Sequence, residues 1–202
     1  MQFPRRALMR VVLLGAVVAV ASFAGPASAA AERTGLQPTA ARQPDGRIRL
    51  QKIVYQHFPT ETYSRPWTGN NVYNTTAVGQ TIRELWFDTT PGWQRWVFGV
   101  SIQNDGTSSD RIKVKATGAA LTGWTVKYFR GTTNITSAVV GGSYTTPSLA
   151  PGGKHLIKVK VTRAAEGFAS SNLSRHVSLT SMANSSNTDA VKLVMRHQTC
   201  GC

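Results

Sequence analysis

The residues best equipped for chemistry lie in His197-Gln-Thr-Cys200-Gly-Cys202, which holds the two cysteines of the sequence. In an oxidising compartment an even pair of thiols tends to close. A disulfide within Cys-Gly-Cys would make a small, strained and easily reduced ring. A second interpretation is pairing of Cys200 or Cys202 with a partner protein. A third is a metal-handling site, since two thiolates and an imidazole suit Cu(I) or Zn(II).

Signatures of an enzyme are missing from the sequence. Neither the G-x-S-x-G nucleophile motif nor the H-E-x-x-H zinc motif occurs. The acidic residues are scattered and the four histidines lie far apart. The fold could still bring His155 or His176 near Asp110 or Glu84. We nevertheless predict a protein that is not an enzyme and has no cofactor.

Aromatic residues offer a different kind of binding chemistry. Trp86, Trp93 and Trp96 lie in one expected hairpin, and Trp67 precedes it. Exposed rings stack on sugars, so Trp67 and Trp93 are the candidates for a carbohydrate site. Large aromatics more often anchor a core, and the pattern predicts that role for Trp86 and Phe98.

Lysines at every second position form the most regular pattern of charge. RIKVKATG (111–118) and HLIKVKV (155–161) alternate apolar and cationic residues. Successive side chains of a strand point to opposite faces of a sheet. The apolar set must face a core, so the lysines face solvent. The same parity directs Lys127, Lys192 and Arg196 outward.

The N-terminal residues predict export. Three arginines precede an apolar run (11–25) that is short for a membrane span, and Ala27-Ser-Ala29 follows it. Together they indicate a signal peptide over 1–29, exported by the general or the twin-arginine route. We expect no transmembrane segment in the mature chain. The whole chain has 23 basic and 9 acidic residues, a balance that favours anionic polymers and surfaces.

Short strands separated by turn signals fill the rest of the chain. Examples of expected strands are 94–103 and 135–140, and Leu149-Ala-Pro-Gly-Gly153 is the clearest turn. This spacing predicts an all-β fold, an antiparallel immunoglobulin-like sandwich of about 7–8 strands over 47–198. A flexible lead (30–46) would precede it and the Cys-Gly-Cys tail (199–202) would follow.

Three stretches carry a resemblance to a known family. They are Asn71-Val-Tyr-Asn-Thr-Thr76 with Gly79-Gln80, then Val100-Ser-Ile-Gln-Asn-Asp-Gly106, then Ser148-Leu-Ala-Pro-Gly152. Over about 47–198 the chain resembles bacterial secreted immunoglobulin-like sandwich modules of the NEW3, CARDB and DUF11 type. Such modules mostly serve as surface, spacer or adhesive domains, usually in tandem, whereas this chain holds one copy.

The resemblance also implies which strands share a sheet. Strands 111–117, 124–129, 175–182 and 190–197 would form one sheet, and 94–103 with 155–162 the other. One outer face would then carry five cations, which are Lys113, Lys115, Lys127, Lys192 and Arg196. We expect this face to hold an anionic polymer, unless its lysines merely prevent edge-to-edge aggregation.

These observations predict a non-catalytic, secreted or cell-surface module that associates non-covalently with the cell envelope or an extracellular anionic polymer. A carbohydrate-binding module and a metal-handling protein are the alternatives. Specific nucleic-acid binding is not expected, because no recognised motif accompanies the charge.

Overall fold

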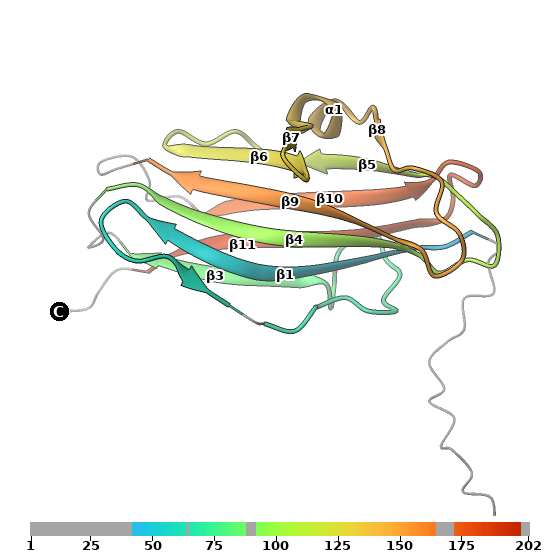
Figure 1. The fold of residues 1–202 in the computed structure, drawn as a ribbon, viewed down its shortest axis with the longest axis horizontal. Helices are drawn as coiled ribbons and strands as arrows, with labels where there is room; N and C mark the ends of the chain where they lie inside the picture. The colour runs from blue at the N-terminus through green and yellow to red at the C-terminus, as the bar shows by residue number, and fades with distance from the viewer. Residues whose placement is uncertain (1–41, 64, 88–91, 165–171, 199–202) are drawn as a thin grey trace, which may run out of the picture. The chain divides into compact units, whose positions relative to one another are not determined.

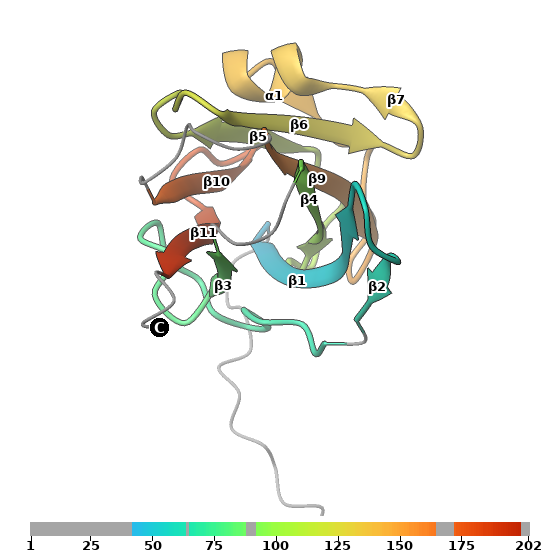
Figure 2. The same ribbon diagram turned by 90° about the vertical axis from the view of Figure 1, so that its left-hand side faces the viewer.

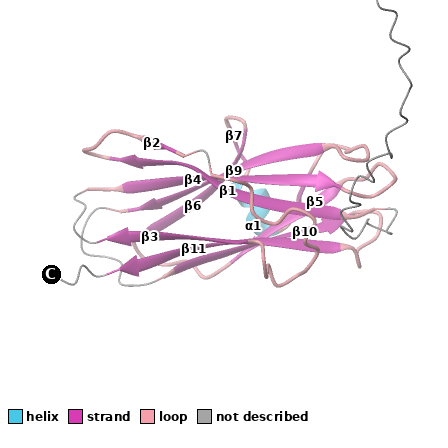
Figure 3. Cartoon of the chain, turned by 90° about the horizontal axis from the view of Figure 1, so that it is seen from below, coloured by secondary structure: helices cyan, strands magenta, loops and turns pink. Residues whose placement is uncertain are grey.

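Two β-sheets packed face to face make up the structure (Figures 1 and 3). The computed structural model describes residues 42–198, except for 64, 88–91 and 165–171. The predicted signal peptide and the cysteine-containing tail lie outside the described residues. The all-β sandwich is confirmed, with eleven strands where about 7–8 were predicted.

The larger sheet has six strands in the order β2-β1-β4-β9-β6-β7, and every neighbouring pair is antiparallel. Its strands are β1 (Pro44–Tyr55), β2 (Glu61–Thr62), β4 (Gln94–Asn104), β6 (Trp124–Arg130), β7 (Thr133–Asn134) and β9 (Lys154–Arg163). The prediction that 124–129 belongs to the other sheet is wrong. β6 pairs with β9, and a strand's own sequence does not determine its partner.

The smaller sheet has five strands in the order β3-β11-β10-β5-β8. Its strands are β3 (Thr81–Phe87), β5 (Ile112–Thr117), β8 (Tyr144–Thr145), β10 (Leu173–Ser181) and β11 (Thr188–Gln198). β3 runs parallel to β11, a departure from the predicted antiparallel pairing. The structure has more strands than predicted because it includes three very short ones. These are β2, β7 and β8, which have two residues each.

One helical turn replaces the strand predicted at 135–140. Helix α1 (Thr136–Gly141) lies beside β7 at the edge where β5 and β6 meet (Figure 2). Asn134 Oδ1 accepts a hydrogen bond from the Thr136 backbone N–H at 3.0 Å. Gly142 ends the helix with φ +71°, a left-handed conformation that glycine adopts without strain. These local contacts override the strand preference of two successive valines.

The core lies between the sheets and follows the predicted alternation. Ile112 and Val114 are fully buried, while Lys113 and Lys115 are exposed. The inward residues of β9 and β11 are buried in the same way; they are Ile157, Val159, Val161, Val191, Leu193 and Met195. Trp86 and Phe98 are core residues as predicted. Trp86 and Trp96 each pack against Trp124, with ring centroids 5.6 and 6.0 Å apart.

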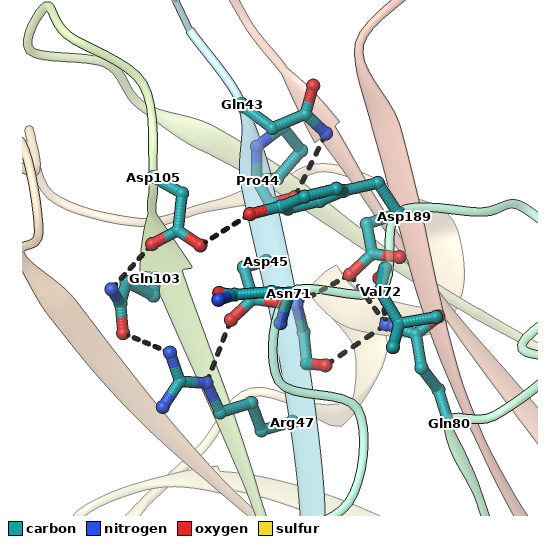
Figure 4. A network of polar contacts seen from close by, with 12 residues as sticks. Gln43, Pro44, Asp45, Arg47, Asn71, Val72, Gln80, Gln103, Asp105 and Asp189 are labelled. Atoms are coloured by element: carbon teal, nitrogen blue, oxygen red, sulfur yellow. Dashed lines mark hydrogen bonds and ion pairs between the residues drawn. The ribbon is translucent and has the colours of Figure 1, made fainter. Parts of the chain in front are cut away.

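A buried polar network fixes one end of the sandwich (Figure 4). Asp45 accepts hydrogen bonds from Arg47 Nε at 2.8 Å and from the Asn71 backbone N–H at 3.0 Å. Asp189 likewise accepts hydrogen bonds from the Gly46 backbone N–H and from Gln80 Nε2. β1 therefore begins at Pro44, inside the segment 30–46 that was predicted to be a flexible lead.

Within the described ranges, no helix is long and apolar enough to cross a membrane.

Candidate functional site: a basic face and its groove

Two lysines face each other on the outer surface of the larger sheet. Lys127 of β6 lies directly opposite Lys160 of β9 in the register. Both point outward, because Tyr128 and Val161 beside them are buried. Like charges directly opposite in a sheet destabilise it. This destabilisation has to be offset by some other benefit of the two lysines, and the binding of an anionic ligand is one.

The two lysines line a shallow groove of about 320 Å³ over β4, β9 and β6. Its lining is Arg95, Thr125, Lys127, Phe129, Lys160 and Thr162. The described lining of the groove therefore contains three cations and no acid.

Aromatic rings and a hydroxyl hold two of these cations in place. Arg95 donates from Nε to Thr162 Oγ1 at 3.0 Å, and its guanidinium carbon lies 4.9 Å from the centre of the Trp93 ring. Lys160 Nζ lies 4.1 Å from the centre of the Phe129 ring. Cations held over rings lose less side-chain freedom when a ligand binds.

Positive charge continues from the groove across the sheet. Lys52 and Lys160 flank Val97 in the register, and Lys160 in turn faces Lys127. Arg49 and Lys158 flank Gly99 one row further along. We call the whole set the basic face; it consists of Arg49, Lys52, Arg95, Lys127, Lys158 and Lys160. The two ion pairs among described residues, Arg47–Asp45 and Arg65–Glu84, include none of these six.

The five predicted polymer-binding cations do not share one surface. Lys113, Lys115 and Arg196 are exposed and Lys192 is half-buried on the outer face of the smaller sheet. Lys127 lies on the larger sheet, so it is separated from the other four by the core. The alternation in 155–161 revealed Lys158 and Lys160, but it carried no information about which strands lie beside them.

The two predicted carbohydrate-stacking residues are half-buried and lie apart. Trp67 has the Arg49 guanidinium 4.5 Å from its ring centre and lies against Gly99. Trp93 has Arg95 beside it. Gly99 and Arg95 are about 13 Å apart along β4 at the rise of a strand. Each ring therefore lies beside a cation of the basic face, Trp67 beside Arg49 and Trp93 beside Arg95.

The predicted cysteine site cannot be placed. Cys200 and Cys202 lie outside the described residues, and for His197 only its backbone position in β11 is described. Among the residues that are described, no three His, Cys, Asp or Glu side chains gather where they could hold a metal ion.

Three of the four residues considered for catalysis, His155, Glu84 and Asp110, have other partners. His155 Nε2 and Tyr144 Oη are 2.7 Å apart, and burial lowers the pKa of His155. Glu84 accepts from Arg65 Nη1 at 2.6 Å in a hollow of about 360 Å³, where burial raises its pKa. Asp110 accepts from the Arg111 backbone N–H at 2.8 Å.

Comparisons with known proteins add little. No family model and no curated protein matches the chain. The FixG-related protein from Vibrio parahaemolyticus is 12% identical over 52% of this chain and 79% of its own, with a TM-score of 0.34. The N-terminal domain of PorA is 11% identical over 60% of this chain and 87% of its own, with a TM-score of 0.39. A family 123 glycoside hydrolase from Clostridium perfringens is 5% identical over 75% of this chain and 27% of its own, with a TM-score of 0.32. Likenesses this remote carry no argument about function.

Proposed function

We propose that this protein is a non-catalytic extracellular module that binds an anionic polymer through the basic face. The observation that carries the proposal is the Lys127–Lys160 pair, two like charges placed opposite each other in a groove whose described lining contains no acid. An extended polyanion would relieve this repulsion. The signal peptide predicted over 1–29 supports a location outside the cytoplasm.

The shape of the surface favours a polymer over a small anion. The cations lie in rows across four strands, β1, β4, β9 and β6, which are about 4.8 Å apart. A chain with regularly spaced carboxylates or phosphates can contact several of them at once. The rings beside Arg49, Arg95 and Lys160 add flat apolar area between the charges.

Two matched charge reversals test the proposal. Lys127→Glu with Lys160→Glu alters the groove, and Lys113→Glu with Lys115→Glu alters the other sheet's outer face by the same charge. We expect the protein to be retained on alginate beads at low salt and released as salt rises, because screening weakens surface attraction. The groove variant should lose about tenfold or more in affinity, and the control variant much less.

Three results would contradict the proposal. Equal losses in both variants would show that net charge alone governs retention. A larger loss in the control variant would assign binding to Lys113 and Lys115. Retention on neutral dextran that ignores salt would instead favour sugar stacking by Trp67 and Trp93.

A further inference from the structure

A second candidate site lies at the edge of the sandwich where β5 and β6 approach each other. It is a cleft of about 310 Å³ between the two sheets. Its described lining consists of Ala116, Thr117, Gly118, Ala120, Trp124, Thr125, Val126, Tyr128, Val140 and Arg175. The cleft thus contains one guanidinium, several small apolar side chains and no acid among these residues.

Arg175 is the charged group of the cleft and has no acidic partner among the described residues. It lies on β10 between buried Leu173 and Val177, so its side chain points inward between the sheets. Its described hydrogen bond runs from Nη1 to the Ser174 carbonyl oxygen at 2.8 Å. Inward-facing cations in proteins are normally paired with an anion, and neither ion pair among described residues involves Arg175.

The side chains of Tyr128 and Trp124 line the same cleft, and each carries a buried donor without a partner in the described part of the chain. Tyr128 and Trp124 are 1% and 8% exposed, and neither Tyr128 Oη nor Trp124 Nε1 has a hydrogen-bond partner. An indole N–H can only donate. Burial raises the pKa of Tyr128 to about 12, so its hydroxyl stays protonated and can donate as well. Leaving such groups unsatisfied costs free energy that an oxyanion would recover.

Gly118 makes room for the guanidinium. A Cβ at this position would lie 2.5 Å from the Ser174 carbonyl oxygen and 2.8 Å from Arg175 Nη1. Its φ of +138° also disfavours any other residue. A neighbouring hollow of about 260 Å³ shares Gly118 and Arg175 and is also lined by His176 and Lys192. Lys192 therefore adds a second positive charge near Arg175, and the described lining of both hollows contains no acid.

We propose that this cleft binds a small organic monocarboxylate, with its carboxylate at Arg175 and a short aliphatic chain against Val126 and Val140. Tyr128 Oη and Trp124 Nε1, which are buried, would turn toward the carboxylate and supply the remaining hydrogen bonds. A cleft of this volume lies near the lower limit for small-molecule sites. The site is separate from the basic face and does not depend on polymer binding.

Titration with butyrate, monitored by NMR of the Trp124 indole N–H, tests the site. The resonance is assigned by its loss in Trp124→Phe. We expect a saturable shift with butyrate, and a much smaller one with butanol, which has the chain without the charge. Arg175→Gln should weaken butyrate binding by about tenfold or more, because charge-assisted hydrogen bonds are lost. Tyr128→Phe, which keeps the ring packing, should weaken it severalfold.

The controls separate this site from the polymer-binding face. Lys113→Gln should leave butyrate binding unchanged, and so should the double reversal of Lys127 and Lys160. An equal response to butanol, an equal response to inorganic phosphate, or unchanged affinity in both Arg175→Gln and Tyr128→Phe would overturn the proposal. If Arg175→Gln does not fold, Tyr128→Phe alone decides.

Discussion

The carboxylate of Asp189 connects three segments of the chain. Its Oδ2 accepts from the Gly46 backbone N–H at 2.6 Å and from Gln80 Nε2 at 2.9 Å, and its Oδ1 accepts from the Asn74 backbone N–H at 3.1 Å. Burial nevertheless outweighs these donors and raises the pKa of Asp189 to about 7 from 3.8. The folded protein therefore keeps a proton at Asp189 over a pH range in which the unfolded chain has lost it.

This difference predicts a pH dependence of stability. Because the folded state binds more protons between about pH 4 and 7, the contribution of Asp189 to the free energy of unfolding falls as pH rises through that range and is level above it. The slope is at most about 1.4 kcal/mol per pH unit. Urea unfolding of the natural protein and Asp189→Asn, from about pH 4.5 to 7.5, measures it. The stability advantage of the natural protein should shrink with pH; a constant difference would contradict the prediction.

For single residues, the sequence predicted whether a side chain points inward or outward, but it did not predict which groups that side chain contacts. The outward positions of Lys113 and Lys115 follow from local alternation, which has a period of two in any strand. The burial of Asp45 and Asp189 could not be predicted. Each is stable inside only because backbone N–H groups from distant segments reach it, and those contacts exist only after folding.

Helix α1 is the element that covers the edge between β5 and β6. Val139 of the helix is fully buried, whereas its neighbour Val140 is 54% exposed. Adjacent residues of the same type thus have opposite environments, which makes them a matched pair for measuring what the helix contributes.

We expect Val139→Ala to lower the free energy of unfolding by about 2 kcal/mol, from lost burial and the space left behind. Val140→Ala should change it by less than about 0.5 kcal/mol, as surface substitutions usually do. Chemical denaturation of both variants provides the comparison. Equal effects would mean that the helix does not pack on the sheets as described.

The helix also shows why an element can be misassigned from sequence. Ile135, Val139 and Val140 are β-branched and favour strands. The hydrogen bonds from Thr136 to Asn134 and the left-handed Gly142 favour a turn of helix instead. Propensity and local hydrogen bonding disagree here, and over six residues the hydrogen bonds prevail.

Across the whole molecule, β11 holds the smaller sheet together. It pairs with β3 on one side and with β10 on the other. Without it, β3 would have no strand beside it in the sheet, and Leu193 and Met195 would be missing from the core.

Removal of β11 should therefore abolish cooperative folding. We expect a chain ending at Asn187 to give no sigmoidal thermal transition by circular dichroism, because several fully buried side chains are lost at once. A chain ending at Gln198, which keeps every described strand, should unfold cooperatively. A sigmoidal transition in the shorter chain would contradict this view of β11.

The fold class could be predicted from sequence, but the grouping of strands into sheets could not. Turn spacing and alternation are local signals, and they gave the sandwich. The pairing of Lys127 with Lys160 joins strands that are separated along the chain by β7, α1 and β8, and nothing in either strand specifies the other. The basic face depends on that pairing, so it became visible only in three dimensions.

The parallel pairing of β3 with β11 also has a consequence for the order of events as the chain is made. In this pairing Thr81 is the register partner of Lys192. Synthesis proceeds from the N-terminus, so β3 is made before β11, its only strand neighbour among the described residues. The smaller sheet therefore cannot be completed until β11 has been made, and until then the unpaired edge of β3 has to be kept from aggregating.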